Sequence, residues 1–270
     1  MPVRDLDLLI KAARAAGEVA TSFSGRTARQ WEKPDGAGLV TEADMAVNEC
    51  LEALLREARP DYGWLSEESE DNLARLGAER VFVVDPIDGT RSFAEGSKTW
   101  AHAIAVVEYG QVVAGVVYLP LRYMLFSAAL GKGAHLNGAP IGTGQTDTLS
   151  RATLLATRAV LAAENWRDGA APRFRRAYRP SLAYRMAVVA QGRFDGMMTI
   201  RPSWEWDVAA GDLIIREAGG VCTDKIGEPL VFNNKKPLVD GIVAGTKGVH
   251  GDIMARLNIP ERAMMEPNSD

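Results

Sequence analysis

Two aspartates stand three positions apart directly after an apolar run at residues 81–84. Residues 85–90 read Asp-Pro-Ile-Asp-Gly-Thr. If the apolar run is a buried strand, Asp85 and Asp88 emerge at its carboxyl end, where α/β proteins commonly bind ligands. The proline restricts the backbone and the glycine permits a tight path, so both carboxylates can converge on a hard cation such as Mg²⁺. The alternative is a polar β-turn, because Asp, Pro and Gly are usual turn residues.

Three further segments place carboxylates beside apolar or aromatic residues. Ser-Glu-Glu-Ser at 66–69 follows an apolar run, although most exposed glutamate pairs are simply solvated. Trp-Glu-Trp-Asp at 204–207 opens a predicted helix, where Asp207 either binds a cation or caps the helix. Val-Thr-Glu-Ala-Asp at 40–44 begins another predicted helix, with the threonine as N-cap and Asp44 at the capping-box position. Carboxylates that a fold crowds together repel one another and need cations to stay ionised.

Periodicity predicts the elements that position these segments. Apolar residues at helical spacing from 6 to 20 predict a first helix that ends near Gly25, and a similar pattern predicts a second helix from about Thr41 to Pro60. Short apolar runs at 62–65 and 81–84 predict strands that lead into acidic residues. The runs that predict an antiparallel meander occupy 103–107, 112–118 and 123–128.

The second half of the chain has a different pattern from about residue 146. Strand-like and helix-like stretches alternate there, as in a layered α/β protein, and they occupy 153–157, 181–190, 194–200, 207–218, 220–223 and 238–244. We therefore predict two domains. The N-terminal α+β half, 1–147, carries most of the metal ligands, and the C-terminal α/β half, 148–270, carries Asp207 and the substrate contacts.

Composition limits the class of protein and its partners. The 270 residues suffice for one large domain or two closely packed ones. The net charge of -4 does not favour nucleic acid, so a small anionic substrate needs local basic side chains or bound metal. Two cysteines without a CxxC motif fit a reducing compartment. No signal peptide or membrane-spanning run is evident, so we expect a cytoplasmic protein without a membrane partner.

Several other catalytic classes lack their signatures in this chain. His102, His135 and His250 are dispersed, which argues against a zinc site. No GxSxG motif is present, which argues against a serine hydrolase. A haloacid-dehalogenase-type phosphatase needs an Asp-x-Asp pair, whereas these aspartates stand three apart.

The four acidic segments together resemble the inositol monophosphatase family. The matching stretches are Leu-Val-Thr-Glu-Ala-Asp (39–44), Ser-Glu-Glu-Ser (66–69), Asp-Pro-Ile-Asp-Gly-Thr-Arg-Ser-Phe (85–93) and Trp-Asp-Val-Ala-Ala-Gly (206–211). They occur in the family's order, and the likeness extends from the first helix to about residue 245. In detail, Pro-Ser-x-x-Trp-Asp at 202–207 is most similar to the bacterial 3′(2′),5′-bisphosphate nucleotidase branch. The resemblance implies an α+β or α/β fold, a layered αβαβα sandwich, and a homodimer that Li⁺ inhibits.

The resemblance also implies metal ligands at the matching positions. Glu67, Asp85 and the carbonyl of Ile87 would hold a first Mg²⁺. Asp85, Asp88 and Asp207 would hold a second, and a weaker third ion would lie near Glu67 through water. Such ions lower the pKa of a bound water and stabilise the attacking and leaving oxygens of an in-line displacement.

Further roles follow from the resemblance for the groups around these ligands. Thr90 and Asp44 would orient and deprotonate the attacking water. The amides of Gly89 and Thr90 would bind phosphate oxygens, as free N–H groups at a helix start can do. Ser181 would present its hydroxyl to the substrate from the start of the helix at 181–190.

The preferred phosphate ester is the least determined feature. We expect a 3′(2′),5′-bisphosphate nucleotidase that converts 3′-phosphoadenosine 5′-phosphate to AMP, with inositol-1-monophosphatase or another sugar phosphatase as the alternative. Members that prefer inositol carry an acidic residue where this chain has Ile200 and Arg201, although Glu205 can substitute for it. Arg201 can pair with a second phosphate or lie solvated on the surface. Trp204 can stack on a base or pack within the protein.

Two other classes of function are weighed against the enzyme. A catalytically idle sensor of phosphate ligands would be expected to lose Thr90, Asp44 or a metal ligand, and none is lost. A partner of RNA or of the transcription machinery gains no support from the acidic composition. The expected partner is therefore a small phosphorylated metabolite and not nucleic acid.

Overall fold

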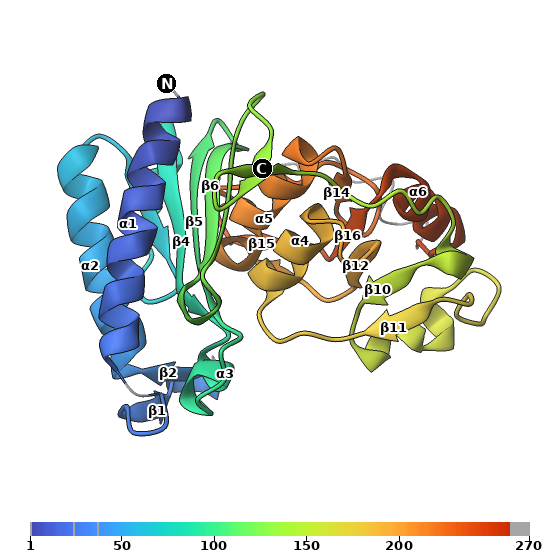
Figure 1. Cartoon of the computed structure of the whole chain (residues 1–270), viewed down its shortest axis with the longest axis horizontal. Coiled ribbons are helices and arrows are strands. Elements are labelled where there is room, and N and C mark those ends of the chain that lie inside the picture. Colours follow the sequence, from blue (N-terminus) through green and yellow to red (C-terminus); the bar gives the residue numbers. More distant parts are fainter. Residues whose placement is uncertain (1, 24, 37, 260–270) are drawn as a thin grey trace.

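A computed structural model describes residues 2–23, 25–36 and 38–259 (Figure 1). The end of the predicted second domain, 260–270, lies outside these ranges. The helices of the described part are α1 Pro2–Ser22, α2 Glu42–Ala58, α3 Thr90–Ala94, α4 Leu182–Ala190, α5 Glu205–Glu217 and α6 Lys247–Arg256. None of them is long and apolar enough to cross a membrane.

A seven-stranded sheet forms the first half of the molecule, with its strands in chain order from β3 to β9. β3 runs parallel to β4 and every later neighbour is antiparallel, so the predicted meander is confirmed. The strands are β3 Gly63–Ser66, β4 Arg80–Asp88, β5 Ala101–Glu108, β6 Gln111–Leu119, β7 Met124–Ala129, β8 Ala134–Leu136 and β9 Ala139–Ile141.

Helices α1 and α2 cover one face of this sheet (Figure 1). Their apolar stripes are buried against sheet residues such as Phe82 and Val84, as the helical periodicity predicts. Thr41 caps α2 and forms a reciprocal capping box with Asp44, which confirms that prediction. The small pair β1 Gln30–Glu32 and β2 Leu39–Thr41 precedes α2.

A five-stranded sheet forms the second half, in the order β11-β10-β12-β16-β14. Its strands are β10 Thr153–Leu155, β11 Arg175–Ala177, β12 Gly196–Thr199, β14 Val221–Thr223 and β16 Ile242–Gly245. The predicted stretch 238–244 divides in two, because a turn with Gly241 at φ 75° separates β16 from β15 Leu238–Val239. β15 pairs instead with β13 Ser203–Trp204.

The order of layers is αβαβα, as predicted. α4 and α5 lie between the two sheets, and α6 lies beyond the second (Figure 1). Side chains from both sheets and from the two middle helices share one apolar cluster. The separation into halves at residue 147 stays a prediction, because α5 of the second half packs on β6 of the first.

Small residues after Asp207 allow α5 to approach its neighbours closely. A Cβ on Gly115 of β6 would lie 3.1 Å from the Cα of Ala210, and a Cβ on Gly211 would lie 2.6 Å from Met186 of α4. Larger side chains would push α5 away from both elements. The Ala-Ala-Gly part of the motif therefore fixes the helix that carries Asp207.

Candidate active site

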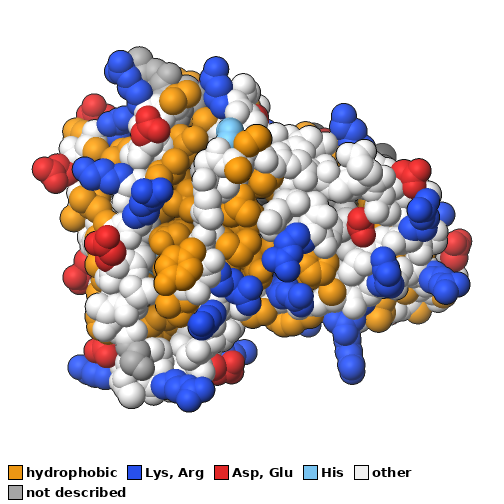
Figure 2. Space-filling model, in the orientation of Figure 1, with side chains coloured by type: hydrophobic (Ala, Val, Ile, Leu, Met, Phe, Trp, Pro, Cys, Tyr) orange, Lys and Arg blue, Asp and Glu red, His pale blue; other side chains and the backbone are white. Residues whose placement is uncertain are grey.

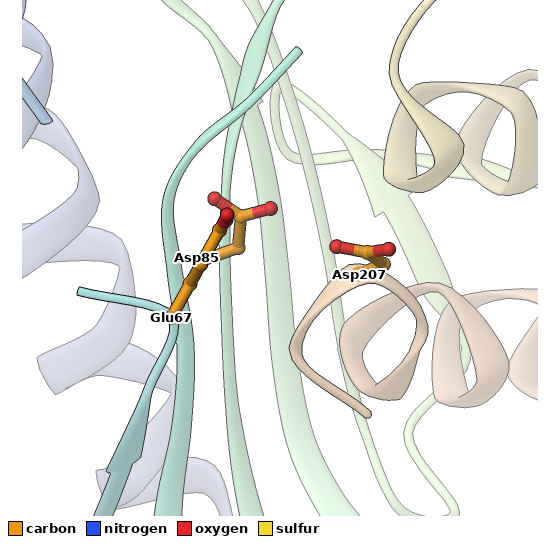
Figure 3. Close-up of side chains that lie close together, drawn as sticks. All are labelled: Glu67, Asp85 and Asp207. Atoms are coloured by element: carbon orange, nitrogen blue, oxygen red, sulfur yellow. The ribbon is translucent and has the colours of Figure 1, made fainter. Parts of the chain in front are cut away.

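Three carboxylates from three elements converge in one cluster (Figure 3). Glu67 follows β3, Asp85 lies in β4, and Asp207 faces them from the first turn of α5. One carboxylate oxygen of each lies within 4.8 Å of the other two. The alternative that Asp207 caps the helix is wrong, because the N-cap is Trp204.

The segment that carries Asp85 is a buried strand rather than a polar turn. β4 continues through Pro86 to Asp88, with an irregular register against β5 between the two aspartates. Asp85 is only 1% exposed, and its Oδ1 has no hydrogen-bond partner among the described residues. A buried carboxylate oxygen without a partner is costly unless a cation pairs with it. This oxygen therefore fits a metal ligand.

The pKa values of the cluster show the same need for a cation. Burial, reinforced by Glu67 and then Asp88, raises the pKa of Asp85 well above its ordinary value. Burial, followed by the charges of Asp88 and Glu67, also raises the pKa of Asp207 well above its ordinary value. A divalent cation with oxygen ligands offsets both the burial and the repulsion.

Asp88 is held by the start of α4. Its Oδ2 accepts hydrogen bonds from the Ser181 hydroxyl at 2.7 Å and the Ala183 amide at 2.6 Å. Burial raises the pKa of Asp88, and these donors oppose the rise. Ser181, predicted to contact substrate, thus contacts a predicted metal ligand, and its φ of 65° is a strained backbone conformation for serine.

Thr90 and Asp44 form the expected hydroxyl–carboxylate pair. The Thr90 hydroxyl lies 3.1 Å from Asp44 Oδ1 and 3.1 Å from the carbonyl oxygen of Ile87. The other oxygen of Asp44 accepts the Thr41 amide at 2.9 Å. Burial raises the pKa of Asp44 to about 6, against these hydrogen bonds. A carboxylate with a pKa near neutrality suits a general base.

The turn between β4 and α3 presents backbone donors. Gly89 has φ 99°, a conformation that favours glycine, and it is the N-cap of α3. No described residue accepts a hydrogen bond from the amides of Gly89 or Thr90. These two amides are therefore available to an anion next to Asp85 and Asp88.

Lys33 is a cation of this site that the sequence did not reveal. Its Nζ lies 2.8 Å from Glu67 Oε1 and 2.8 Å from Glu68 Oε1. Burial lowers the pKa of Lys33, but the two glutamates outweigh it and raise the pKa above its ordinary value. A lone lysine in a loop gives no spacing signal, so only the fold shows this contact.

The structure places the predicted substrate contact Glu205 inside the protein and leaves Arg201 at the surface, where it stays a prediction. Glu205 is fully buried, and its carboxylate accepts the amides of Asn233 at 2.7 Å and Asn234 at 2.9 Å. It cannot also bind a sugar hydroxyl, so we omit it from the proposed substrate site. Arg201 is exposed. Trp204 stacks on the Trp206 ring, with centroids 4.7 Å apart.

The same asparagines connect the two halves of the site. The guanidinium of Arg75, itself 3% exposed, donates to the side-chain oxygen of Asn233 at 2.6 Å and to the carbonyl of Asn234 at 2.9 Å. Asp71 holds this guanidinium through two further hydrogen bonds. The network therefore joins the segment after Glu67 to Glu205, two residues before Asp207.

This network predicts the effect of Glu205→Gln. Glutamine keeps one acceptor oxygen but turns the other into an NH2 group that faces a backbone N–H donor, so the free energy of unfolding should fall by about 1–3 kcal/mol. The Mg²⁺ concentration for half-maximal activity should rise severalfold, because Asp207 loses its fixed position relative to Glu67. Urea unfolding and a Mg²⁺ titration measure the two effects. Glu57→Gln makes the same change at an exposed glutamate and should alter neither the free energy of unfolding nor the Mg²⁺ dependence. If Glu205→Gln instead raised the substrate KM and left stability unchanged, Glu205 would contact the substrate.

The raised carboxyl pKa values predict how stability depends on pH without divalent cations. The folded protein keeps protons on Glu68, with a pKa of about 7, and on Asp85 and Asp207 to a higher pH than the unfolded chain does. The free energy of unfolding should therefore fall as the pH rises from about 6.5 through the Glu68 pKa of about 7. His102 does not interfere there, because burial lowers its pKa to about 4.

Urea unfolding in EDTA across this pH range tests the prediction. Saturating Mg²⁺ should flatten or reverse the slope, because the cation stabilises the ionised carboxylates. A metal-free protein whose stability rises over the same range would contradict the crowding of these carboxylates.

Together the fold and the site define a layered α/β protein with a buried acidic metal centre. The profile of the inositol monophosphatase family matches residues 3–258. The chain belongs to this family, whose members are Mg²⁺-dependent phosphatases that hydrolyse phosphate monoesters.

Individual relatives cover almost the whole chain. The inositol-1-monophosphatase of Rhizobium meliloti is 34% identical over 90% of this chain and 92% of its own length. The Nus factor SuhB of Escherichia coli K12 is 32% identical over 93% and 95%. The structure of a Thermotoga maritima IMPase superposes with a TM-score of 0.79 at 28% identity, covering 93% of this chain and 96% of that one. None of these three is named as a bisphosphate nucleotidase.

Proposed function

We propose that this phosphatase acts on a small monoester that carries a second phosphate, and specifically that it is a 3′(2′),5′-bisphosphate nucleotidase. The observation that supports this choice is the position of Arg185. Burial raises the pKa of both Asp88 and Asp207, and the charge of Arg185 opposes that rise, so the guanidinium lies within electrostatic range of the metal site. The hydroxyls of an inositol ring can accept only neutral hydrogen bonds from this cation, whereas a second phosphate can form a charged, bidentate pair with it.

The surroundings of Arg185 fix its orientation. Its Nε donates to the carbonyl of Arg179 at 2.5 Å. Its guanidinium also lies over the Tyr178 ring, 4.6 Å from the centroid. No described carboxylate forms an ion pair with it. Arg185 therefore replaces Arg201 in our proposal as the contact for the second phosphate.

In the proposed reaction the chain orients a water and binds the phosphoryl oxygens. Asp44 accepts a proton from the attacking water through the Thr90 hydroxyl. The amides of Gly89 and Thr90 donate to the phosphoryl group as charge develops on it.

The proposed cofactor is Mg²⁺, two to three ions per site. We propose as its ligands Glu67, Asp85, Asp88, Asp207 and the carbonyl of Ile87. The bound cation supplies charge stabilisation and water activation. From the family resemblance we also propose inhibition by Li⁺ and a homodimer.

Inositol-1-monophosphatase is the second candidate. The Rhizobium meliloti relative of that name supports it over nearly the full length of the chain. The burial of Glu205 argues against inositol-1-monophosphatase. Glu205 was the acidic residue that could bind sugar hydroxyls, but its carboxylate accepts the backbone amides of Asn233 and Asn234 instead.

The deciding experiment measures phosphate release at saturating Mg²⁺ from 3′-phosphoadenosine 5′-phosphate and inositol 1-phosphate, each with and without Li⁺. Arg185→Gln should raise the KM for the bisphosphate about tenfold to a hundredfold, because it removes a charged hydrogen-bond donor. The KM for inositol 1-phosphate should change little. Arg201→Gln, the matched exposed variant, should affect neither substrate.

Each other outcome identifies an alternative. Preference for inositol 1-phosphate in the unmodified protein would support the second candidate. Tight binding of both compounds without turnover would support a sensor of phosphate ligands. Equal effects of the two arginine variants would remove Arg185 from the substrate site.

A further inference from the structure

The segment from Arg151 to Arg201 is strongly basic although the chain is acidic. It contains ten arginines and no lysine, against three carboxylates, Glu164, Asp168 and Asp195. Its net charge of +7, within a chain of net charge -4, leaves -11 for the remainder. Figure 2 shows Lys and Arg side chains gathered over the part of the molecule that carries β10 and β11.

These arginines lack the carboxylate partners that half of the described arginines outside the segment have. None of the ten forms an ion pair with a carboxylate of the described residues. Outside the segment, six of the twelve described arginines pair with an aspartate or glutamate, namely Arg56, Arg59, Arg75, Arg80, Arg216 and Arg256. Unpaired like charges repel, so their collection on one surface favours an anionic ligand.

Three of the unpaired arginines line one hollow. Arg151, Arg173 and Arg175 surround a space of about 390 Å³ together with Ser150 and Phe174. All three arginines are exposed, and their side chains make no hydrogen bond to any residue of the described part. The hollow is large enough for a small ligand.

Backbone contacts hold the walls of the hollow in place. β11 runs parallel to β10, and the Arg175 amide donates to the carbonyl of Ala152 at 2.9 Å, directly beside Arg151. Arg173 lies at a bend just before β11 and Arg175 is the first residue of the strand, and both line the hollow. The Phe174 ring packs inward, 6.3 Å from the Trp166 ring.

We infer that this hollow binds an anion with two or three linked phosphoryl groups, either inorganic polyphosphate or the phosphate tail of a nucleotide. Guanidinium forks bind phosphate oxygens in pairs, and three of them match a short chain of phosphoryl groups. The Ser150 hydroxyl adds one further donor. This site is separate from the acidic cluster and does not depend on the proposed enzymatic function.

Calorimetric titration of the full-length protein with inorganic tripolyphosphate in EDTA tests the inference. Without divalent cations the acidic cluster repels anions, so binding reports on the hollow and not on the active site. Arg173→Gln/Arg175→Gln should weaken binding at least tenfold. Arg4→Gln, which removes an exposed charge from α1, should bind as the unmodified protein does. If the double variant does not fold, Arg151→Gln alone should still weaken binding severalfold.

The source of the phosphate chain follows from a second titration with ATP. Tighter binding of ATP than of tripolyphosphate assigns the hollow to nucleotides, and equal or weaker binding assigns it to polyphosphate. Equal affinities of Arg4→Gln and the double variant would overturn the inference. A short single-stranded RNA provides a further test, with Arg158→Gln as a variant outside the hollow. The inference would be overturned if the RNA bound more tightly than tripolyphosphate and if Arg158→Gln weakened RNA binding as much as the double variant does.

Discussion

Asp85→Asn should lower phosphate release at least about a thousand-fold at saturating Mg²⁺, since it removes a charge from the centre of the acidic cluster. The same change should stabilise the metal-free protein. Asp85 is buried among carboxylates that repel it, and its Oδ1 has no described partner. A neutral amide of nearly equal volume removes the cost of burying this carboxylate or of keeping it protonated, so the melting temperature in EDTA should rise by a few degrees.

Two melting curves and one assay test this prediction. The rise in melting temperature on adding Mg²⁺ should be large in the unmodified protein and nearly absent in Asp85→Asn. Asp147→Asn makes the same chemical change at an exposed aspartate and should change neither activity nor stability. Near-normal turnover in Asp85→Asn would remove Asp85 from the metal site, and a lower melting temperature in EDTA would show that its charge is satisfied within the protein.

The layers of the fold were predictable because they depend on local patterns. The meander from β5 to β7 follows from apolar runs separated by glycine or proline turns, and α2 follows from its capping box. The approach of segments distant in sequence was less predictable. Asp85 and Asp207 are 122 positions apart, and only the likeness of four motifs to a known family indicated that they would meet.

Residues that act through the backbone of another segment gave no signal in the sequence. Glu205 and Arg201 both stand beside Asp207 and both looked like substrate contacts. Glu205 differs from Arg201 because the backbone amides of Asn233 and Asn234 donate hydrogen bonds to its carboxylate. No spacing rule links positions so far apart in the sequence. Arg185 was overlooked for the same reason, since only the packing of α4 brings its charge within electrostatic range of Asp88 and Asp207.

Net charge was also a poor guide to the surface. The chain has a net charge of -4 although the segment from Arg151 to Arg201 has a net charge of +7, because the rest of the chain is acidic. Charge summed over a whole chain describes its long-range field, whereas a ligand responds to the nearest charges within about a Debye length. A count over a shorter window would have shown the arginines between Arg151 and Arg201, although not that they lack acidic partners.

Thr90→Ala should lower kcat about a hundred-fold or more and leave the affinity for Mg²⁺ nearly unchanged. The Thr90 hydroxyl reaches both Asp44 and the carbonyl of Ile87 at 3.1 Å, so it can hand a proton from water to Asp44. Removing the hydroxyl leaves the predicted metal ligands in place, but the attacking water can no longer pass its proton to Asp44 through residue 90. Mg²⁺ titration separates the two effects, because a water-orienting role predicts lower maximal activity at an unchanged half-activating concentration.

Thr90→Ser distinguishes loss of the hydroxyl from loss of packing. Serine keeps the oxygen and lacks only a methyl group, so it should recover most of the activity that alanine loses. The pH profile gives an independent test, because the acidic limb of kcat should follow the Asp44 pKa of about 6 in the unmodified protein and in Thr90→Ser. In Thr90→Ala that limb should flatten, since the proton no longer reaches Asp44. If the limb instead persisted unchanged in Thr90→Ala, Asp44 would take its proton without Thr90, and the hydroxyl would serve only to hold the turn at Ile87.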